Sequence, residues 1–308
     1  MSHPRPFHNA AFITAEPRLS ILIPFYRESP LALLRNLQTG DPHDIEIVLL
    51  DDGSAMPEIT AEMSRYVEAS PLACELITLD VNEGRASGRN RLTSAARGDY
   101  YLFLDADMLP DSGDFLDQWL TVIKHDRPAV VFGGFSLKQA PQDKAYALHR
   151  QMAGQSDVLD AQTRALQPEK YVFTSNLLVR RDVFEAEGFD ANFTGWGWED
   201  TEWGMRVAAR YGVGHVDNTA THMGLDRAET LAKKYEQSAG NFARVVARHK
   251  DVVAKYPSYM VAVRLKKIPF IKQFRPLFKV VGLAGFLPLK LRALSLRLYR
   301  AALYAEVV

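Results

Sequence analysis

The chain has 308 residues, of which 47% are hydrophobic and 24% charged, a composition that supports a folded core and excludes global disorder. Its 37 lysines and arginines balance 37 aspartates and glutamates, so net charge gives no sign of nucleic acid as the main partner. Cys74 is the only cysteine, which excludes an intrachain disulfide framework and a cysteine-rich zinc site, and indicates a reducing compartment.

At this length we expect one large α/β domain with an appendage rather than two full catalytic domains. Residues 1–17 contain no apolar run long enough for a signal peptide and are expected to form an N-terminal extension. The catalytic domain is expected to cover residues 18–235, and residues 236–308 to form a helical, basic C-terminal region. We therefore expect a cytoplasmic protein whose relation to the membrane depends on its C-terminal region.

Short apolar runs rich in β-branched residues alternate with helical patterns, which is typical of a mostly parallel sheet covered by helices. Strands are expected at residues 19–25, 45–52, 74–79, 100–107, 129–135 and 171–179. Helices are expected at residues 30–39, 57–69, 85–97, 114–125, 200–211 and 227–249, with another near 145–152. Because ligands bind beyond the carboxyl ends of such strands, the residues after the first, second and fourth strands should meet in one crevice.

Polar and acidic side chains follow the first two strands. The first strand ends in the run from Pro24 to Glu28, and the second strand ends in Asp51-Asp52 followed by Gly53-Ser54. The carboxylates of Asp51 and Asp52 can accept hydrogen bonds from a base or a ribose, and they can equally cap the turn after the strand. The order of the residues does not choose between these two roles.

A glycine and two arginines lie where a loop enters the helix expected at residues 85–97. Gly84 precedes this helix, and Arg85 and Arg89 lie in its first two turns. Backbone N–H groups at a helix start, together with Arg89, can hold a phosphate or the polar edge of a nucleotide. The alternative is an ordinary glycine turn before a solvated basic helix.

Two acids follow the fourth strand, in the sequence Asp105-Ala106-Asp107. Because successive residues of an extended chain point to opposite sides, both carboxylates can face the crevice while Ala106 points away. Such a pair repels itself without a cation, and its oxygens suit Mg²⁺ or Mn²⁺, which would neutralise the charge building on a leaving nucleoside diphosphate. An acidic turn after a strand is the structural alternative.

Residues 193–202 place two of the chain's four tryptophans beside acids on a glycine-rich turn. Trp196 and Trp198 offer indole faces that suit the C–H face of a sugar. A carboxylate of Glu199 or Asp200 beside them suits a general base that takes the proton from an attacking hydroxyl. The alternative is a pair of core tryptophans at the start of a helix, where acids are favoured by the helix dipole.

In this order, the motifs resemble a family-2 type glycosyltransferase of the GT-A fold, over about residues 18–225. Residues 196–200 also resemble the acceptor and catalytic segment of β-1,4-galactosyltransferases and bacterial chondroitin-type polymerases. The resemblance implies Mn²⁺ or Mg²⁺ as the metal and a UDP-linked galactose or N-acetylhexosamine as the donor. The acceptor would be a hydroxyl of a glycan or glycolipid, in the synthesis of cell-surface polysaccharide or glycolipid.

The resemblance also implies a role for each candidate residue. Asp107 would bind the metal and His222 would complete its site, with Asp105 beside them and nearer the ribose. Asp200 would be the base of an inverting transfer, and Glu199 would hold the acceptor or donor sugar. The acceptor would contact Trp196 and Trp198. The uridine and ribose would be surrounded by Pro24, Tyr26, Glu28, Asp51, Asp52, Gly84 and Arg89.

Two other functions are open to a chain with these motifs. A nucleotidyltransferase that forms sugar nucleotides has a related fold, although residues 24–30 lack the glycine-rich basic loop that this class uses. A catalytically silent scaffold would bind a membrane or a partner, although the intact acids argue against it. The chain also departs from processive synthases, because it lacks their Gln-x-x-Arg-Trp motif and multiple spanning helices, and Gly88 stands where alanine is more usual.

Residues 261–304 interleave lysines and arginines with apolar residues and contain no acid. This basic amphipathic pattern is suited to an anionic membrane surface. Its longest uncharged run, residues 280–289, is too short to span a bilayer. A helix pair that packs on the catalytic domain and an oligomer interface are the alternatives. We expect membrane contact, and therefore a peripheral position on the inner face of the cell membrane.

Overall fold

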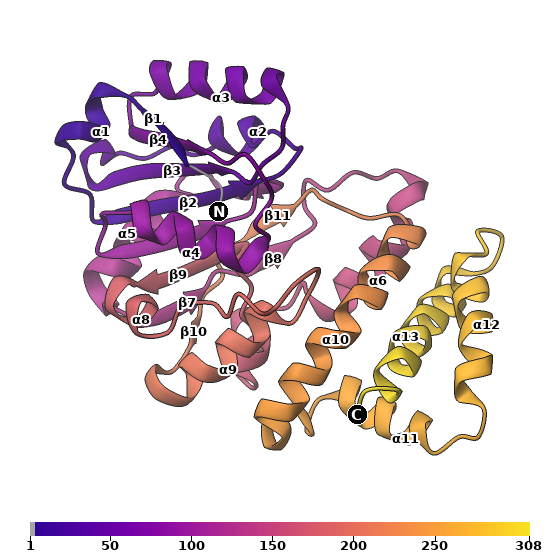
Figure 1. Ribbon diagram of the computed structural model, residues 1–308. Coiled ribbons are helices and arrows are strands. Elements are labelled where there is room, and N and C mark those ends of the chain that lie inside the picture. Colours follow the sequence, from indigo (N-terminus) through magenta and orange to yellow (C-terminus); the bar gives the residue numbers. More distant parts are fainter. Residues whose placement is uncertain (1–3) are drawn as a thin grey trace.

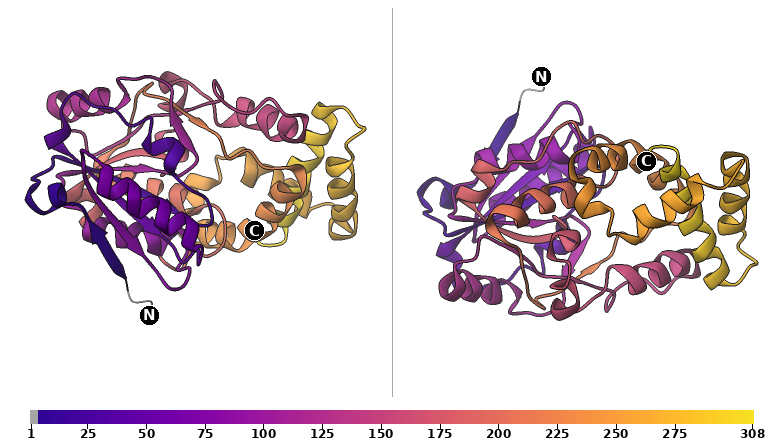
Figure 2. Two further views of the ribbon diagram at one scale, coloured as in Figure 1. Left: turned by 90° about the horizontal axis from the view of Figure 1, so that it is seen from above. Right: turned by 90° about the horizontal axis from the view of Figure 1, so that it is seen from below.

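A computed structural model describes residues 4–308 and contains two parts (Figure 1). The first is an α/β part formed by about the first two thirds of the chain, and the second is a group of helices at its side. Seen from above and below, the C-terminal helices lie at one end of the molecule and the α/β part at the other (Figure 2). The predicted α/β class with a helical C-terminal extension is confirmed.

The central sheet has eight strands in the order β1-β4-β3-β2-β5-β9-β7-β10. In that order the strands are β1 (Arg5–His8), β4 (Ala73–Thr78), β3 (Ile45–Asp51), β2 (Leu19–Phe25), β5 (Tyr100–Leu104), β9 (Asn176–Arg180), β7 (Val130–Phe132) and β10 (Gly214–His215). The pairs that join β4, β3, β2 and β5 are parallel, and so is β7 with β10, whereas β1 and β9 pair antiparallel with their neighbours. The central strands are parallel, as predicted, and β1 adds part of the expected N-terminal extension to the edge.

Helices cover both faces of this sheet. One face packs against α2 (Leu31–Leu34), α3 (Pro57–Ala69) and α5 (Phe115–Asp126), and the other against α4 (Arg85–Ala95), α8 (Arg181–Ala186) and α9 (Glu199–Tyr211). Alternate residues of β2 enter the two cores, with Ile21 and Ile23 in the first and Leu22 in the second. Burial on both faces explains why these strands are continuous apolar runs.

A small second sheet positions part of the site. Its strands are β6 (Met108–Pro110), β11 (Ala220–His222) and β8 (Phe135–Ser136), in the order β6-β11-β8. The register of β11 and β6 pairs His222 with Met108, and the Met223 N–H donates to the Asp107 carbonyl at 2.8 Å. Two segments more than one hundred residues apart are thereby joined at Asp107.

Four predicted elements differ clearly from those observed. The strand predicted at 100–107 ends at Leu104, because Asp105-Ala106-Asp107 forms a turn before β6. The helix predicted at 30–39 is shorter and covers only α2 (Leu31–Leu34). Residues 39–42 form a loop instead, in which the Thr39 hydroxyl donates to the Asp117 carboxylate at 2.8 Å. The strand predicted at 129–135 ends at Phe132, before two glycines, and resumes as β8. The strand predicted at 171–179 begins at Asn176, because the Thr174 N–H donates to a side chain instead of a neighbouring strand.

The C-terminal helices form a third core. They are α10 (Ala228–Val253), α11 (Pro257–Lys266), α12 (Ile271–Leu283) and α13 (Leu289–Ala305), and α6 (Ala147–Ser156) packs with them. The domain boundary proposed at residue 235 lies inside α10. Buried side chains of this core include Phe242, Leu296 and Tyr304. Within residues 4–308, no helix combines the length and the apolar character needed to cross a bilayer. The remaining short helices are α1 (Ala10–Thr14) and α7 (Ala161–Arg164).

Candidate active site

One side of the crevice is a network of carboxylates and arginines, here called the arginine side: Arg85, Arg89, Asp105, Glu199 and Asp200. Arg89 Nη2 donates to Asp105 Oδ1 at 2.7 Å. Arg85 Nε donates to Glu199 Oε1 at 2.6 Å, and its Nη2 lies 3.5 Å from Asp105 Oδ2. Arg85 and Arg89 are one turn apart on α4, which brings both guanidinium groups to the same face of the helix. The network joins α4, the end of β5 and the start of α9.

The arginines control the charge of Asp105. Burial alone would raise the pKa of this carboxyl, but the positive charges of Arg89 and Arg85 outweigh burial and hold the pKa below its ordinary value. Arg89 is itself buried, and its Nε and Nη1 atoms have no hydrogen-bond partner among the described residues. Buried donors without partners are costly, so these two nitrogens indicate a place where an acceptor-rich ligand would fit.

Asp200 lies at the first turn of α9 and is buried. The Thr174 N–H donates to its Oδ2 at 3.2 Å, and the Thr174 hydroxyl lies 3.1 Å from both carboxylate oxygens. Burial raises the pKa of Asp200 to about 6, and the negative charge of Glu199 adds to this shift. A carboxylate with this pKa is a better proton acceptor than an ordinary aspartate and is still largely ionised at neutral pH.

The other side of the crevice is formed by Glu28, Asp107, His222 and Gly224, here called the histidine side. His222 Nε2 lies 3.3 Å from Asp107 Oδ2. Burial would lower the pKa of His222, but the hydrogen bond and charge of Asp107 outweigh burial and raise it. The pKa of Glu28 is raised by burial and by the negative charge of Asp107. Glu28, Asp107 and His222 therefore act on one another electrostatically.

The Gly224 backbone lies directly against the Asp107 carboxylate. A Cβ atom at this position would lie 1.8 Å from Asp107 Oδ2, so any side chain would displace the carboxylate. The absence of a side chain at Gly224 therefore allows the Asp107 carboxylate to take this position beside His222.

A carboxylate and an imidazole are suitable ligands for Mn²⁺ or Mg²⁺, so Asp107 and His222 fit a divalent metal as a two-residue site. Within residues 4–308, no three His, Cys, Asp or Glu side chains come together in a metal-binding group. Asp105 was expected beside Asp107 at the metal, but its carboxylate is bound by the arginines. The remaining ligands would therefore have to come from the diphosphate and water.

Two acids expected near the nucleotide make hydrogen bonds within the protein. Asp51 Oδ1 accepts from the Ser54 N–H at 2.8 Å, which is the turn-capping alternative. Asp52 accepts from the N–H groups of Glu83 and Gly84, at 2.7 and 3.0 Å. Asp52 therefore fixes the loop before α4, and these two N–H groups are no longer available to a phosphate.

The remaining nucleotide candidates Pro24, Tyr26 and Gly84 lie at the end of β2 and at the start of α4. Pro24 is half-buried within β2, and the Tyr26 ring is exposed beneath the guanidinium of Arg27 at 5.0 Å. Gly84 has a φ of 86° at the start of α4, a conformation that favours glycine. An exposed tyrosine ring is suited to stacking on a base.

The two tryptophans have different surroundings. Trp198 Nε1 donates to the Tyr304 hydroxyl at 2.9 Å, and its ring packs 4.8 Å from that of Phe242. Trp196 is half-buried, with the Lys234 ammonium 5.6 Å from its ring centroid. Trp198 thus anchors the glycine-rich turn to the C-terminal helices, whereas the indole N–H of Trp196 has no hydrogen-bond partner among the described residues.

Sequence reasoning missed several side chains that shape this site. The spacing of Arg85 and Arg89 could have identified Arg85, because residues four apart share a helix face. No sequence signal identifies Thr174 as the partner of Asp200. The same is true of His149, whose ring lies 6.3 Å from that of His222 and whose pKa burial lowers to about 4.

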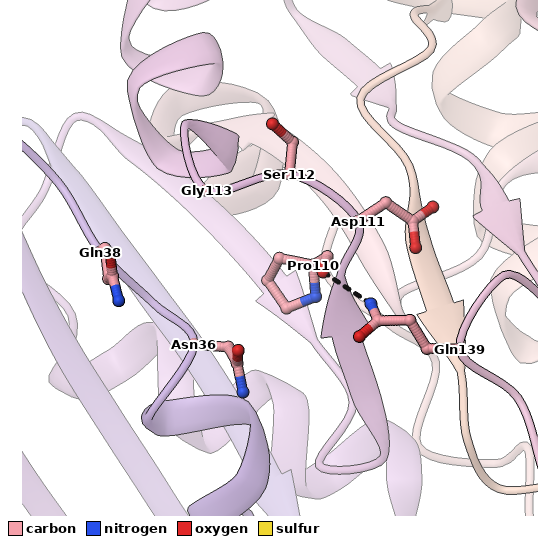
Figure 3. Close-up of a pocket in the computed structure, with 7 residues that line it drawn as sticks. All are labelled: Asn36, Gln38, Pro110, Asp111, Ser112, Gly113 and Gln139. Carbon is pink, nitrogen blue, oxygen red and sulfur yellow. Dashed lines mark hydrogen bonds between the residues drawn. The ribbon is translucent and has the colours of Figure 1, made fainter.

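A separate cavity of about 170 Å³ lies at the far end of β6 (Figure 3). Asn36, Asp111 and Gln139 are among the residues that line it, and the Gln139 amide donates to the Pro110 carbonyl at 2.9 Å. None of the predicted site residues lines this cavity, so the candidate active site is the group of side chains on the arginine and histidine sides.

A family model described as glycosyl transferase family 2 matches residues 20–188, more than half of the chain. The chain is similar to a validoxylamine A glucosyltransferase of Streptomyces hygroscopicus subsp. limoneus, with 28% identity over 63% of this chain and 48% of that protein. It is also similar to polypeptide N-acetylgalactosaminyltransferase 13 of Rattus norvegicus, with 30% identity over 37% of this chain and 21% of that protein. The chain therefore spans about half or less of the length of these curated relatives.

Two solved structures share the fold. A mannosyltransferase of Pyrobaculum calidifontis in complex with GDP-Man and Mn²⁺ has a TM-score of 0.63 at 17% identity, over 98% of this chain and 90% of that chain. S. aureus TarS in complex with UDP-GlcNAc has a TM-score of 0.56 at 14% identity, over 94% of this chain and 90% of that chain. At these identities the likeness shows the GT-A fold alone. The family match and the fold agree, and the chain belongs to glycosyl transferase family 2.

Proposed function

We propose that the protein is a metal-dependent, inverting glycosyltransferase that moves a sugar from a UDP-sugar to a hydroxyl of a glycan or glycolipid. The observation that carries this proposal is the presence of two groups of side chains with different chemistry, the arginine side and the histidine side. A buried acid with a raised pKa, Asp200, lies on the arginine side, and the Asp107–His222 pair lies on the histidine side. Such a site offers a proton acceptor and a place for the charge of a diphosphate.

The arginine side would hold the donor. Arg89 has two buried nitrogens without partners among the described residues, next to Asp105. A ribose hydroxyl can donate to a carboxylate, while a phosphate or carbonyl oxygen can accept from a guanidinium. Tyr26 and Pro24 at the end of β2 would pack against the uracil. This assignment keeps the nucleotide at the carboxyl ends of parallel strands.

The histidine side would hold the metal. A divalent cation held by Asp107 and His222 would neutralise the negative charge that develops on the departing UDP. Glu28 adds a further negative charge to this region. Gly224, which carries no Cβ, allows the Asp107 carboxylate to lie where it could bind this cation.

Asp200 would be the general base. It would take the proton from the acceptor hydroxyl as that oxygen attacks the anomeric carbon on the face opposite the leaving UDP, so the configuration inverts. Thr174 would hold the carboxylate in place through its N–H and hydroxyl. Glu199 is held by Arg85 beside the base and would bind a sugar hydroxyl, with the Trp196 ring beneath the acceptor.

A donor with galactose or N-acetylhexosamine is favoured, because the segment 196–200 resembles enzymes that use these sugars. The relatives include a glucosyltransferase and an N-acetylgalactosaminyltransferase, which agrees with a hexose or N-acetylhexosamine donor. The acceptor belongs to cell-surface polysaccharide or glycolipid synthesis in this proposal. An anionic membrane surface on the inner face of the cell membrane would be met by the C-terminal helices.

The test is a screen of UDP-sugars by release of UDP, with Mn²⁺, with Mg²⁺ and with a chelator. We expect one donor to be turned over only when metal is present, and Asp107→Asn and Asp200→Asn proteins with unchanged melting temperatures to be inactive. If both folded variants keep the parent rate, the roles proposed for these acids are wrong. Release of pyrophosphate from a nucleoside triphosphate would instead support a nucleotidyltransferase. Absence of turnover and of stabilisation by UDP and Mn²⁺ would support a silent scaffold.

A further inference from the structure

Helix α12 carries an apolar stripe on its outer face. Phe270 at its N-terminal end, and Phe274, Leu277 and Val280 within it, recur every three or four residues, which places them on one side of the helix. Their exposed fractions are 71%, 53%, 57% and 63%. Phe286, in the loop after α12, is 89% exposed. Contiguous exposed apolar residues of this size are uncommon on a surface that faces only water.

The stripe is outside because the opposite face of α12 is already packed. Phe278 and Leu283 contact the third core, and a Cβ atom on buried Gly282 would lie 2.5 Å from Leu296 of α13. α13 lies between α12 and α10, so α12 forms the edge of the molecule (Figures 1 and 2). The stripe runs for roughly 15 Å at the helical rise per residue.

Neighbouring residues extend the stripe into a surface, here called the hairpin surface. It adds Ile268 before α12 and Leu291 and Leu294 on α13, which are 46%, 43% and 54% exposed. Residues 268–294 hold eight of the fifteen exposed large hydrophobic residues of the described chain. The exposed apolar residues are therefore concentrated at one end of the molecule and not scattered.

The charges around this surface are positive. Residues 257–305 contain no acid. Lys272 and Arg275 share the carboxylate of Glu306, and Lys279 lies 2.7 Å from Glu236, so two acids partly balance these three cations. In the part of the chain that the structure describes, Lys267 and Lys290 have no acidic partner. They lie just before α12 and near the start of α13, and so near the two ends of the apolar stripe.

We infer that the hairpin surface docks on a lipid bilayer with anionic headgroups, with α12 parallel to the membrane plane. A helix with apolar residues on one face and cations at its ends is suited to this position. A second copy of the chain is the poorer match, because a symmetric contact would bring the unpaired lysines together without acids. This docking surface rests on the proposed function, whose acceptor is anchored in a membrane. Most of the binding free energy would come from apolar side chains inserted into the bilayer, and less from basic residues that pair with acids of the protein.

The docked helices connect to the candidate site through α13. The Tyr304 hydroxyl, on this helix, accepts from Trp198 Nε1 at 2.9 Å and lies 2.8 Å from Ser238 Oγ. The glycine-rich turn beside Asp200 is therefore fixed to the same helix pair that meets the lipid. An acceptor anchored in the bilayer would be held near that turn.

The experiment is flotation of the full chain with vesicles of phosphatidylcholine alone and of phosphatidylcholine with phosphatidylglycerol. We expect binding to the anionic vesicles and at least about tenfold weaker binding of the double variant Phe274→Ser/Leu277→Ser, because both side chains lose their apolar burial. Leu166→Ser removes an 81% exposed leucine on a different surface and should bind as the parent does. Lys267→Glu/Lys290→Glu should weaken only the binding that depends on phosphatidylglycerol.

Parent-like binding of Phe274→Ser/Leu277→Ser, with an unchanged melting temperature, would overturn the inference. So would an absence of vesicle binding, or a parent chain that dimerises in sedimentation through this surface and ignores lipid. Because flotation requires no turnover, its result is independent of the UDP-release screen. A chain that floats with vesicles and releases no UDP would support the docking surface and contradict the proposed function. A chain that releases UDP and does not float would support the proposed function and contradict the docking surface.

Discussion

The arginine side and the histidine side differ in how the negative charges of their acids are balanced. On the arginine side, Asp105 and Glu199 are matched by Arg85 and Arg89, and the pKa of Asp105 lies below its ordinary value. On the histidine side, Asp107 has the single partner His222, which is cationic only when protonated.

This difference shows where the site lacks positive charge. The arginine side has two arginines for its three acids, whereas the histidine side has two acids and one histidine. A divalent cation would balance the histidine side, where no lysine or arginine within residues 4–308 pairs with Asp107. The two sides therefore predict different effects of substitution.

The largest expected effect comes from removing the base on the arginine side. Asp200→Asn keeps the shape of the side chain and loses the proton acceptor, so kcat should fall by about 10²–10⁴-fold. UDP release at saturating donor measures the loss, and thermal melting checks the fold. Asp182→Asn, which changes an exposed acid on α8, is the matched control and should keep the parent rate. A similar loss in both variants would contradict the assignment of the base.

On the histidine side, His222→Ala should change metal dependence rather than the chemical step. The Mn²⁺ concentration for half-maximal activity should rise by at least about tenfold. Loss of a residue that only supports a metal ligand already weakens metal affinity by this factor, and His222 is proposed as a ligand itself. Arg85→Gln should leave that concentration unchanged. A metal titration that moves equally in both variants would remove the distinction between the two sides.

The pH dependence of kcat tests the role of Asp200 as the base. Burial raises its pKa to about 6, and the base must be ionised, so kcat should fall about tenfold per unit as the pH drops below that value. The residual rate of Asp200→Asn should lack this acid limb. Turnover across a buffer series at constant ionic strength provides the measurement, and a profile with no decline near pH 6 would contradict the raised pKa.

Gly224→Ala should have a smaller effect that is confined to the histidine side. The new Cβ would meet Asp107 Oδ2 at 1.8 Å and push the end of a side chain aside, so Mn²⁺ affinity should weaken several-fold with little loss of stability. Gly113→Ala meets nothing within 4 Å and serves as control. Calorimetric titration of Mn²⁺ in the presence of UDP distinguishes the two variants. Equal Mn²⁺ affinities would show that the position of the Asp107 carboxylate does not affect metal binding.

The smallest expected effect is on stability. Tyr304→Phe removes the hydroxyl that bonds Trp198 and Ser238, which should lower the free energy of unfolding by about 1–3 kcal/mol. Chemical denaturation measures the change. Tyr259→Phe, on α11, has no hydroxyl hydrogen bond to lose within residues 4–308 and should be neutral. Equal stabilities would mean that Tyr304 does not anchor the turn.

The sequence predicts the fold better than the partners within the site. Burial on both faces makes β2 and β3 continuous apolar runs, and both strands start where the pattern predicts. The first residues of the strand predicted at 171–179 are absent because Thr174 bonds Asp200, a long-range contact that local patterns cannot contain.

Within the site, the sequence places Asp105, Asp107 and Asp200 in one crevice but cannot separate their surroundings. Asp105 and Asp107 are two residues apart, and their different environments come from α4 and β11, which reach them through the tertiary fold. Spacing also offered two roles for Asp51, and only the structure shows that its carboxylate caps a turn.

The central claim is that the histidine side binds a divalent cation together with the diphosphate of the donor. Calorimetric titration of UDP with and without Mn²⁺ tests it most directly, in the parent chain and in Asp107→Asn. We predict that Mn²⁺ strengthens UDP binding to the parent and has no such effect on the variant. Equal affinity for UDP in the parent with and without Mn²⁺, or a variant that keeps the full effect of Mn²⁺, would contradict the claim.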